Sequence, residues 1–151
     1  WSMRVTAPIL AAGGAALKAG VDFEAGMSQV QALTQGTAEE MEKMSELARH
    51  LGETTRFSAT EAAEGMAFLG MAGWETSEIL SGMPGLLDLA ASSNMDLGRA
   101  ADITTNIMAA FNMEASESNR MADLLAYAAS NANTNVEQMG KYCPPTEKSV
   151  A

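Results

Sequence analysis

Few residues in this sequence could carry out chemistry, and their spacing groups them into no familiar site. There is one histidine, His50, and one cysteine, Cys143, among 151 residues. A structural zinc site needs about four Cys, His or carboxylate ligands, and a disulfide framework needs cysteines in pairs. One His and one Cys therefore exclude both from this chain alone. They also provide no Cys–His or Ser–His–Asp set for nucleophilic catalysis.

The acidic residues lack the pairing that acid–base catalysis needs. Glu39, Glu40 and Glu42 lie together in the sequence, and we interpret them as the solvated first turn of a helix, where negative charge favours the helix dipole. Three aspartates that could act as acids or bases are isolated from one another: Asp88, Asp102 and Asp123. We therefore predict no catalytic residue, no cofactor-binding residue, no cofactor and no metal ligand.

The remaining reactive groups have simpler structural interpretations. His50 ends a predicted helix just before Gly52, where a cation favours the negative end of the helix dipole. Cys143, next to Pro144, is predicted to be a small packing residue. Gly13–Gly14 follows no predicted strand, so it does not have the strand–turn–helix setting of a phosphate-binding loop.

Composition restricts the protein class further. Hydrophobic residues make up 47% of the chain, which is enough for a core, and the net charge is −10. Binding to nucleic acid phosphates needs clustered cations, so free nucleic-acid binding is not expected. No stretch reaches the roughly 20 apolar residues of a membrane-spanning helix. The chain begins with Trp1, and we interpret it as a piece of a longer polypeptide.

Apolar residues recur at helical spacing almost throughout the chain. Met41, Met44, Leu47 and Leu51, for example, share one face of a helix. No segment shows the sustained alternation typical of a strand, and β-branched residues are sparse. We predict an all-α fold, a compact array of short helices and helical hairpins. The predicted helices span residues 8–19, 21–35, 38–51, 59–72, 77–82, 84–93, 97–111, 117–132 and 135–142.

Residues that favour helix starts precede many of these segments. Three segments have the sequence of a capping box, in which an N-terminal hydroxyl and a glutamate three residues later exchange hydrogen bonds with the backbone. They are Thr37–Glu40, Ser58–Glu61 and Thr134–Glu137. Asp96 and Ser116 are further predicted N-caps.

Glycine and proline indicate where helices end. Gly52 and Gly73 follow apolar stripes, where a left-handed C-cap favours glycine. Pro84 is predicted to separate two short helices, because proline lacks an amide donor. Pro144–Pro145 is predicted to stop the last helix after Tyr142 or the next residue.

The chain also contains an internal repeat of 38 residues. At that offset Ala62–Ala63 matches Ala100–Ala101, and Leu86–Leu87 matches Leu124–Leu125. The predicted N-caps fall in phase as well: Ser58, Asp96 and Thr134. Each unit contains a helix, a short turn and a second helix. Such units stack so that each covers the apolar face of its neighbour.

The predicted helix faces are rich in alanine and methionine and poor in aromatic rings. The chain has 12 methionines, and aromatic residues are 5% of the total. Methionine adapts to irregular surroundings, so these stripes have two interpretations. They are either ordinary core filling or a surface that binds several partners. Trp74 lies in a predicted loop, where a buried anchor is the simpler interpretation.

Several longer sequence motifs resemble those of one known family. The motifs run in order from Val21 to Lys148. They are Asp22–Ala32, Leu51–Ala63 with Gly65–Met66 and Met71–Gly73, Met83–Ala91, Asp96–Asp102, Ser130–Val136 and Lys141–Lys148. In these motifs the chain resembles the core region of the tail tape measure, or minor tail, proteins of tailed bacteriophages.

The resemblance implies a structural protein without catalytic residues in this region. Such proteins set tail length during assembly, dock to the tail tip or baseplate hub and assist genome ejection through the host envelope. The implied partners are copies of the chain itself as a trimer or hexamer, tip or hub proteins, the tail tube protein, tail assembly chaperones and the host membrane during ejection. No specific nucleic-acid binding is implied. The implied location is the lumen of the virion tail, and the host cytoplasm during assembly.

The resemblance also suggests a division of the chain. We predict an apolar, Gly- and Ala-rich helical lead-in at 1–20, the core helical domain at 21–143 and the start of a next segment at 144–151. As one straight helix, 151 residues would span only about 230 Å at about 1.5 Å per residue. The many caps and breaks instead indicate a compact helical domain attached to a longer rod.

Two other classes of protein fit less well. A generic helical adaptor of a secreted or prophage-encoded protein would lack the linear motif match. Small secreted helical-hairpin effectors also carry a Trp-x-Gly turn, whereas Trp74 is followed by Glu75–Thr76. A peptidoglycan hydrolase carried by a tail would need a paired carboxylate cleft or a Cys–His set, and the sequence provides neither.

Overall fold

The computed structural model describes residues 3–131 and 135–142, and within these ranges it contains helices and no strand. The all-α prediction is therefore confirmed. The elements are α1 (Met3–Thr34), α2 (Ala38–Thr54), α3 (Ala59–Met71), α4 (Thr76–Ser92), α5 (Leu97–Ala110), the 3₁₀ helix η1 (Ala115–Glu117), α6 (Ser118–Asn131) and α7 (Val136–Tyr142).

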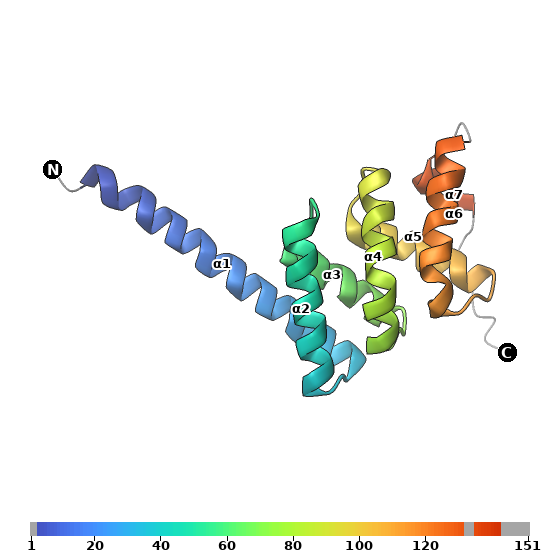
Figure 1. Cartoon of the computed structure of the whole chain (residues 1–151), viewed down its shortest axis with the longest axis horizontal. Helices are drawn as coiled ribbons and strands as arrows, with labels where there is room; N and C mark the ends of the chain where they lie inside the picture. Colours follow the sequence, from blue (N-terminus) through green and yellow to red (C-terminus); the bar gives the residue numbers. More distant parts are fainter. Residues whose placement is uncertain (1–2, 132–134, 143–151) are drawn as a thin grey trace.

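The helices form two layers of an elongated array. In Figure 1, α2, α4 and α6 stand side by side along the array, while α3 and α5 cross beside them. Contacts run from α2 to α4 and from α4 to α6 in one layer. In the other layer they run from α1 to α3, from α3 to α5 and from α5 to α7. The N-terminal part of α1 projects beyond the array (Figure 1). We call these the even and the odd layer.

The predicted repeat sets the positions of the helices. In the odd layer α3 begins at Ala59 and α5 begins at Leu97, 38 residues later. In the even layer α2 begins at Ala38 and α4 at Thr76, again 38 residues apart. The C-terminal part of α1 with α2 therefore forms a first hairpin unit, followed by α3–α4 and α5–α6, and α7 begins a fourth. The internal repeat in the sequence revealed the second and third units but not the first. The helices of the first unit match the later ones in position more than in residue identity.

Three helices end in the same left-handed turn. The amides of Trp74, Met95 and Met113 donate to carbonyls five residues earlier, at 3.1, 3.0 and 2.9 Å. The preceding residues have positive φ angles: Gly73 at 89°, Asn94 at 51° and Asn112 at 54°. This pattern is the Schellman motif, in which an apolar residue after the turn packs back on the helix. The predicted C-cap at Gly73 is confirmed, and Trp74 is the buried anchor that follows it.

Most of the predicted N-caps are confirmed. Thr37 and Glu40 form a capping box, in which the Thr37 amide donates to Glu40 Oε2 at 2.8 Å. Ser58 and Glu61 form a second, with the corresponding distance 2.7 Å. Asp96 accepts from the amide three residues later at 2.9 Å. One reciprocal pair was not predicted, because Glu75 is a less usual cap: its amide donates to Glu78 Oε2 at 2.8 Å.

Of the two remaining predicted N-caps, one is wrong and the other lies outside the described part. Ser116 lies inside η1, which runs directly into α6, so Ser116 does not cap α6. The residue preceding η1 is Glu114. Thr134 lies outside the described residues, and Asn135 caps α7 by accepting from the Gln138 amide at 2.8 Å. The described part of this last helix reaches Tyr142, and the residues predicted to stop it lie outside the described residues.

Two predicted helix breaks are wrong. The predicted helices 8–19 and 21–35 are parts of the single helix α1, which ends at Thr34, because an interior glycine such as Gly20 costs only about 1 kcal/mol relative to alanine. The predicted helices 77–82 and 84–93 are likewise parts of the single helix α4, which continues through Pro84 and ends at Ser92. Ile79 and Leu87 are both buried on the core side of α4. Their packing outweighs the hydrogen bond that the proline removes.

Gly52 is not the C-cap that the sequence predicted. It lies inside α2, which continues to Thr54. A Cβ atom at Gly52 would lie 2.6 Å from the backbone nitrogen of Ala59, the first residue of α3. Glycine is needed here because the end of α2 approaches the start of α3 closely. His50 is exposed on α2, and its carbonyl accepts from the Thr54 hydroxyl at 2.7 Å.

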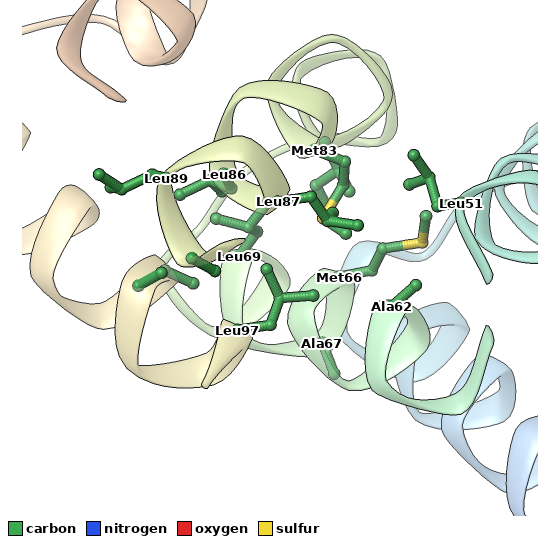
Figure 2. Packing of buried hydrophobic residues seen from close by; sticks show 14 of the residues in the cluster. Leu51, Ala62, Met66, Ala67, Leu69, Met83, Leu86, Leu87, Leu89 and Leu97 are labelled. Carbon is green, nitrogen blue, oxygen red and sulfur yellow. The ribbon is translucent and has the colours of Figure 1, made fainter. Parts of the chain in front are cut away.

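The core runs along the array between the two layers. Figure 2 shows Met66, Leu69 and Leu97 from the odd layer packed against Met83 and Leu87 of α4. Six methionines are buried in this core: Met27, Met44, Met66, Met83, Met108 and Met121. For these six, core filling rather than partner binding is the correct interpretation of the methionine stripes.

One buried group in the core lacks a partner. Thr104 is fully buried on α5, and its hydroxyl has no hydrogen bond. Burying an unpaired hydroxyl costs about 1–3 kcal/mol. We expect Thr104→Val to raise the free energy of unfolding by about 1 kcal/mol in urea denaturation. Thr105→Val is the matched control, since Thr105 Oγ1 donates to the Ala101 carbonyl at 2.9 Å. A loss of stability in Thr104→Val would contradict this assignment.

Candidate interaction surface

Two cavities of the array have no titratable side chain in their lining. One cavity of about 310 Å³ is lined by Trp74, Asn106 and Met113 among others, and no titratable side chain lines it. Another lies between α4, α6 and α7, and its lining is serine, alanine, asparagine and valine. These two linings provide no acidic or basic side chain for proton transfer.

The reactive residues singled out from the sequence stay apart in the fold. Asp88 and Asp123 are exposed on α4 and α6. Asp102 is paired with an arginine, since Arg99 Nη1 donates to its Oδ2 at 2.8 Å within the same helix. In the part of the chain that the structure describes, no three His, Cys, Asp or Glu residues come together to hold a metal ion. Cys143 lies outside the described residues.

Glu40 has a structural role beyond the predicted capping box. Its Oε2 accepts from the Thr37 amide and hydroxyl at 2.8 Å, and its Oε1 accepts from the Thr76 hydroxyl at 3.0 Å. Thr76 is the buried first residue of α4, so the carboxylate joins the starts of two even-layer helices. These hydrogen bonds lower the pKa of Glu40, and the one from the Thr37 amide has the largest effect.

This pKa shift predicts a pH dependence of stability. A carboxyl whose pKa is lower in the folded state stabilises the protein above its unfolded pKa of about 4.3, and this contribution is lost as pH falls through the folded value. We expect the free energy of unfolding of Glu40→Gln to fall less than that of the wild type between about pH 6 and pH 3. The exposed neighbour Glu42, changed to Gln, is the control. Equal losses in wild type and Glu40→Gln would contradict the assignment.

Large apolar side chains are exposed in three parts of the array. One group lies on the projecting part of α1, a second on the outer side of the odd layer, and a third on α6. The residues are Leu17, Val21, Leu33, Phe68, Met71, Phe111, Leu124 and Tyr127. Near the first group, an apolar groove of about 590 Å³ lies beside Phe23, whose ring is 5.2 Å from the Arg49 guanidinium.

The last helix of the even layer presents an exposed face at the C-terminal end of the array. Its four residues are Arg120, Asp123, Leu124 and Tyr127, and we call them the α6 end face. The opposite side of α6 packs on α4, where a Cβ at Gly82 or Gly85 would touch Ser118 or Asn119. Asn119 Nδ2 also donates to the Ser81 carbonyl at 2.9 Å.

The other end of the even layer is polar. In α6 the residues that face α4 are buried: Ser118, Met121, Ala122 and Leu125. The residues two repeats earlier, at the same positions of α2, are Glu42, Ser45, Glu46 and Arg49. Three of these four, all except Ser45, are exposed. Repeat arrays need such a polar outer face at a terminal unit to stay soluble.

Comparison with known proteins identifies the family of this helical array. The family model described as phage-related minor tail protein matches residues 45–146. The chain belongs to this family. It is also 40% identical over 149 residues to the tape measure protein of Pneumococcus phage Dp-1, covering 97% of this chain and 13% of that protein. No solved structure matches the chain.

The resemblance that the sequence motifs indicated is thereby confirmed for this chain. Its motif Leu51–Ala63 has a structural task in this fold. Arg56 Nη1 donates to Asn94 Oδ1 at 2.8 Å, and Nη2 donates to the carbonyls of Ala90 and Met95 at 3.0 and 3.1 Å. Arg56 thus ties the turn after α2 to the turn after α4.

None of the helices that the structure describes is long and apolar enough to cross a membrane. The residues important for its architecture are those that bind one hairpin to the next, such as Glu40, Arg56 and Asn119. Sequence analysis could not find them, because each acts across about one repeat and its partner is set by the stacking of the units.

Proposed function

We propose that this chain is a compact helical segment of a longer tape measure protein. The observation that carries the proposal is the 40% identity with a phage tape measure protein across 97% of the chain. The chain spans 13% of that relative, so the activities of a whole tape measure protein extend well beyond these residues. We propose that the whole protein sets tail length, docks at the tail tip or baseplate hub and assists genome ejection.

The fold supports a docking role for this segment rather than a measuring role. A ruler needs extended length, and a straight helix gains about 1.5 Å per residue. Stacked helices advance only about 8–10 Å per packed helix, so an array of 38-residue hairpins is a poor ruler. We propose that the array docks in the tail tube lumen, with the tip or hub proteins, the tube protein and assembly chaperones as partners. Self-association as a trimer or hexamer is part of the same proposal.

The acidic charge suits a protein that must leave the tail before DNA passes. With a net charge of −10, the segment is repelled by DNA phosphates, and this repulsion is strongest at low salt. We expect no binding of the isolated protein to duplex DNA in a low-salt mobility-shift experiment. Binding that disappears on adding salt would contradict this part of the proposal.

The proposal is tested by removing the segment from the phage. We expect an in-frame deletion of residues 21–142 to abolish tail assembly, or to leave tails of abnormal length, in electron micrographs of lysates. The matched control is Glu42→Gln, which changes one exposed carboxylate on the polar end of the array. It is expected to give normal tails. Normal tails and normal infectivity in the deletion phage would refute the proposal.

A further inference from the structure

We propose that the α6 end face is a binding site for one more helix, the second helix of a fourth hairpin unit in the longer polypeptide. This inference rests on the proposed function, in which the chain is part of a longer tail protein. The occupant is an amphipathic helix that continues the even layer of α2, α4 and α6.

The first support is the contrast in burial between equivalent residues. Leu86 and Leu89 of α4 are each 1% exposed. The residues one repeat later, Leu124 and Tyr127 of α6, are 49% and 69% exposed. The same positions are therefore core where a next even helix is present and surface where none is present. Exposed large apolar side chains in such a register indicate a missing packing partner.

The second support is that the fourth unit has already begun. The helix α7 starts at Val136, which is fully buried, and it packs on α5 as α5 packs on α3. A Cβ at Gly140 would lie 2.9 Å from Ile103 of α5, so the two helices are close. Equivalent residues of successive even helices are 38 residues apart, as Ser81 and Asn119 are. One such step beyond α6, the next even helix would follow residue 151. It would lie on the outer side of α6.

The third support concerns the choice between this helix and a second copy of the chain. A second copy stacked head to tail would place the polar end of α2 on the α6 end face. Glu42, Glu46 and Arg49 would then lie against Leu124 and Tyr127. Burying such charges against apolar side chains is costly. The polar end of α2 is therefore a poor partner for the α6 end face.

The side chains of the α6 end face restrict which helix can pack there. Where α4 presents Gly82 and Gly85 to α6, the equivalent residues of α6 are Arg120 and Asp123. The partner helix cannot approach α6 as closely as α6 approaches α4. It needs an apolar stripe opposite Leu124 and Tyr127 and polar or oppositely charged groups opposite Arg120 and Asp123.

Thiol labelling tests this inference. Tyr127→Cys is introduced in a Cys143→Ser background, both in the 151-residue chain and in the longer tail protein that carries it. We expect the labelling rate of the new thiol to fall on the order of tenfold or more in the longer protein. The fall should not depend on protein concentration, because the covering helix is in the same chain. Asp88→Cys, exposed on α4 and outside the α6 end face, is the control and should label at similar rates in both.

Three other outcomes would overturn the inference. Equal labelling at position 127 in both proteins would show that nothing covers the face. Protection that is lost on dilution would show that a second copy covers it instead. Protection of both reporter thiols would show general shielding rather than a site on α6. The readout does not depend on tail assembly, so normal tails in the deletion phage described above would refute the proposed function without changing this result.

Discussion

Gly52→Val is expected to lower the free energy of unfolding by about 3 kcal/mol. A Cβ atom at this position would lie 2.6 Å from the backbone nitrogen of Ala59 and 3.0 Å from its Cα. Backbone atoms at the start of a capped helix cannot move aside as a flexible side chain can. Relief therefore requires α2 and α3 to separate, which opens the core around Leu51 and Phe57. Urea denaturation followed by circular dichroism measures the change.

The matched control is the same substitution at Gly20, another glycine inside a helix. A Cβ at Gly20 would meet no atom within 4 Å, and valine has a slightly better helix propensity than glycine. We expect Gly20→Val to be neutral or to stabilise by a few tenths of a kcal/mol. Equal effects at the two positions would show that helix propensity, rather than the contact between α2 and α3, decides the outcome.

Arg56→Ala is expected to cost about 2 kcal/mol of unfolding free energy, because hydrogen bonds from a charged donor contribute about 1.5–3 kcal/mol. The guanidinium makes three hydrogen bonds to the turn after α4 and lies 4.8 Å from the Phe57 ring centroid. The guanidinium places its donors in a rigid plane that a lysine ammonium does not reproduce. We therefore expect Arg56→Lys to recover less than half of the loss in the same denaturation experiment.

The control for Arg56 is a second exposed arginine. Arg120 lies 3.6 Å from Glu117 in an exposed pair, and such pairs contribute little. We expect Arg120→Ala to change stability by less than about 0.5 kcal/mol. If the two alanine variants were equally stable, the link that Arg56 makes between units would have no energetic importance.

The local signals in the sequence were sufficient to predict the all-α fold and most helix starts. Hydroxyl and carboxylate caps such as Thr37, Ser58 and Asp96 act within four residues, so their partners are adjacent in the sequence. The turn at Gly73 is local for the same reason. The 38-residue offset then indicated how the units stack, because repeated helices bury the same faces.

The errors arose where contacts between units override local preference. Pro84 was expected to break a helix, but the buried side chains on both sides of it hold α4 together. Gly52 was interpreted as a C-cap, although its role is to allow a close approach between helices. Glu40 was expected to be solvated, yet its partner Thr76 lies 36 residues away. None of these contacts could be predicted without the packing of the array.

The two end faces illustrate the same limit. Leu124 and Tyr127 have the same apolar character as the core residues Leu86 and Leu89. Their positions in the repeat are equivalent, so the sequence alone does not distinguish the buried pair from the exposed pair. Only the order of the units along the array shows that no described helix lies beyond α6 in the even layer, and that Glu42, Glu46 and Arg49 of α2 form a polar end.

The most direct test of this account is the tail length of phage that carries one extra hairpin unit. The central claim is that the segment is a compact array in the assembled tail, so the second unit, residues 59–96, would be duplicated in frame. We predict tails within about 10 Å of wild-type length, since a stacked hairpin adds only one helix width. Tails longer by about 57 Å, the length of 38 residues of straight helix, would contradict it.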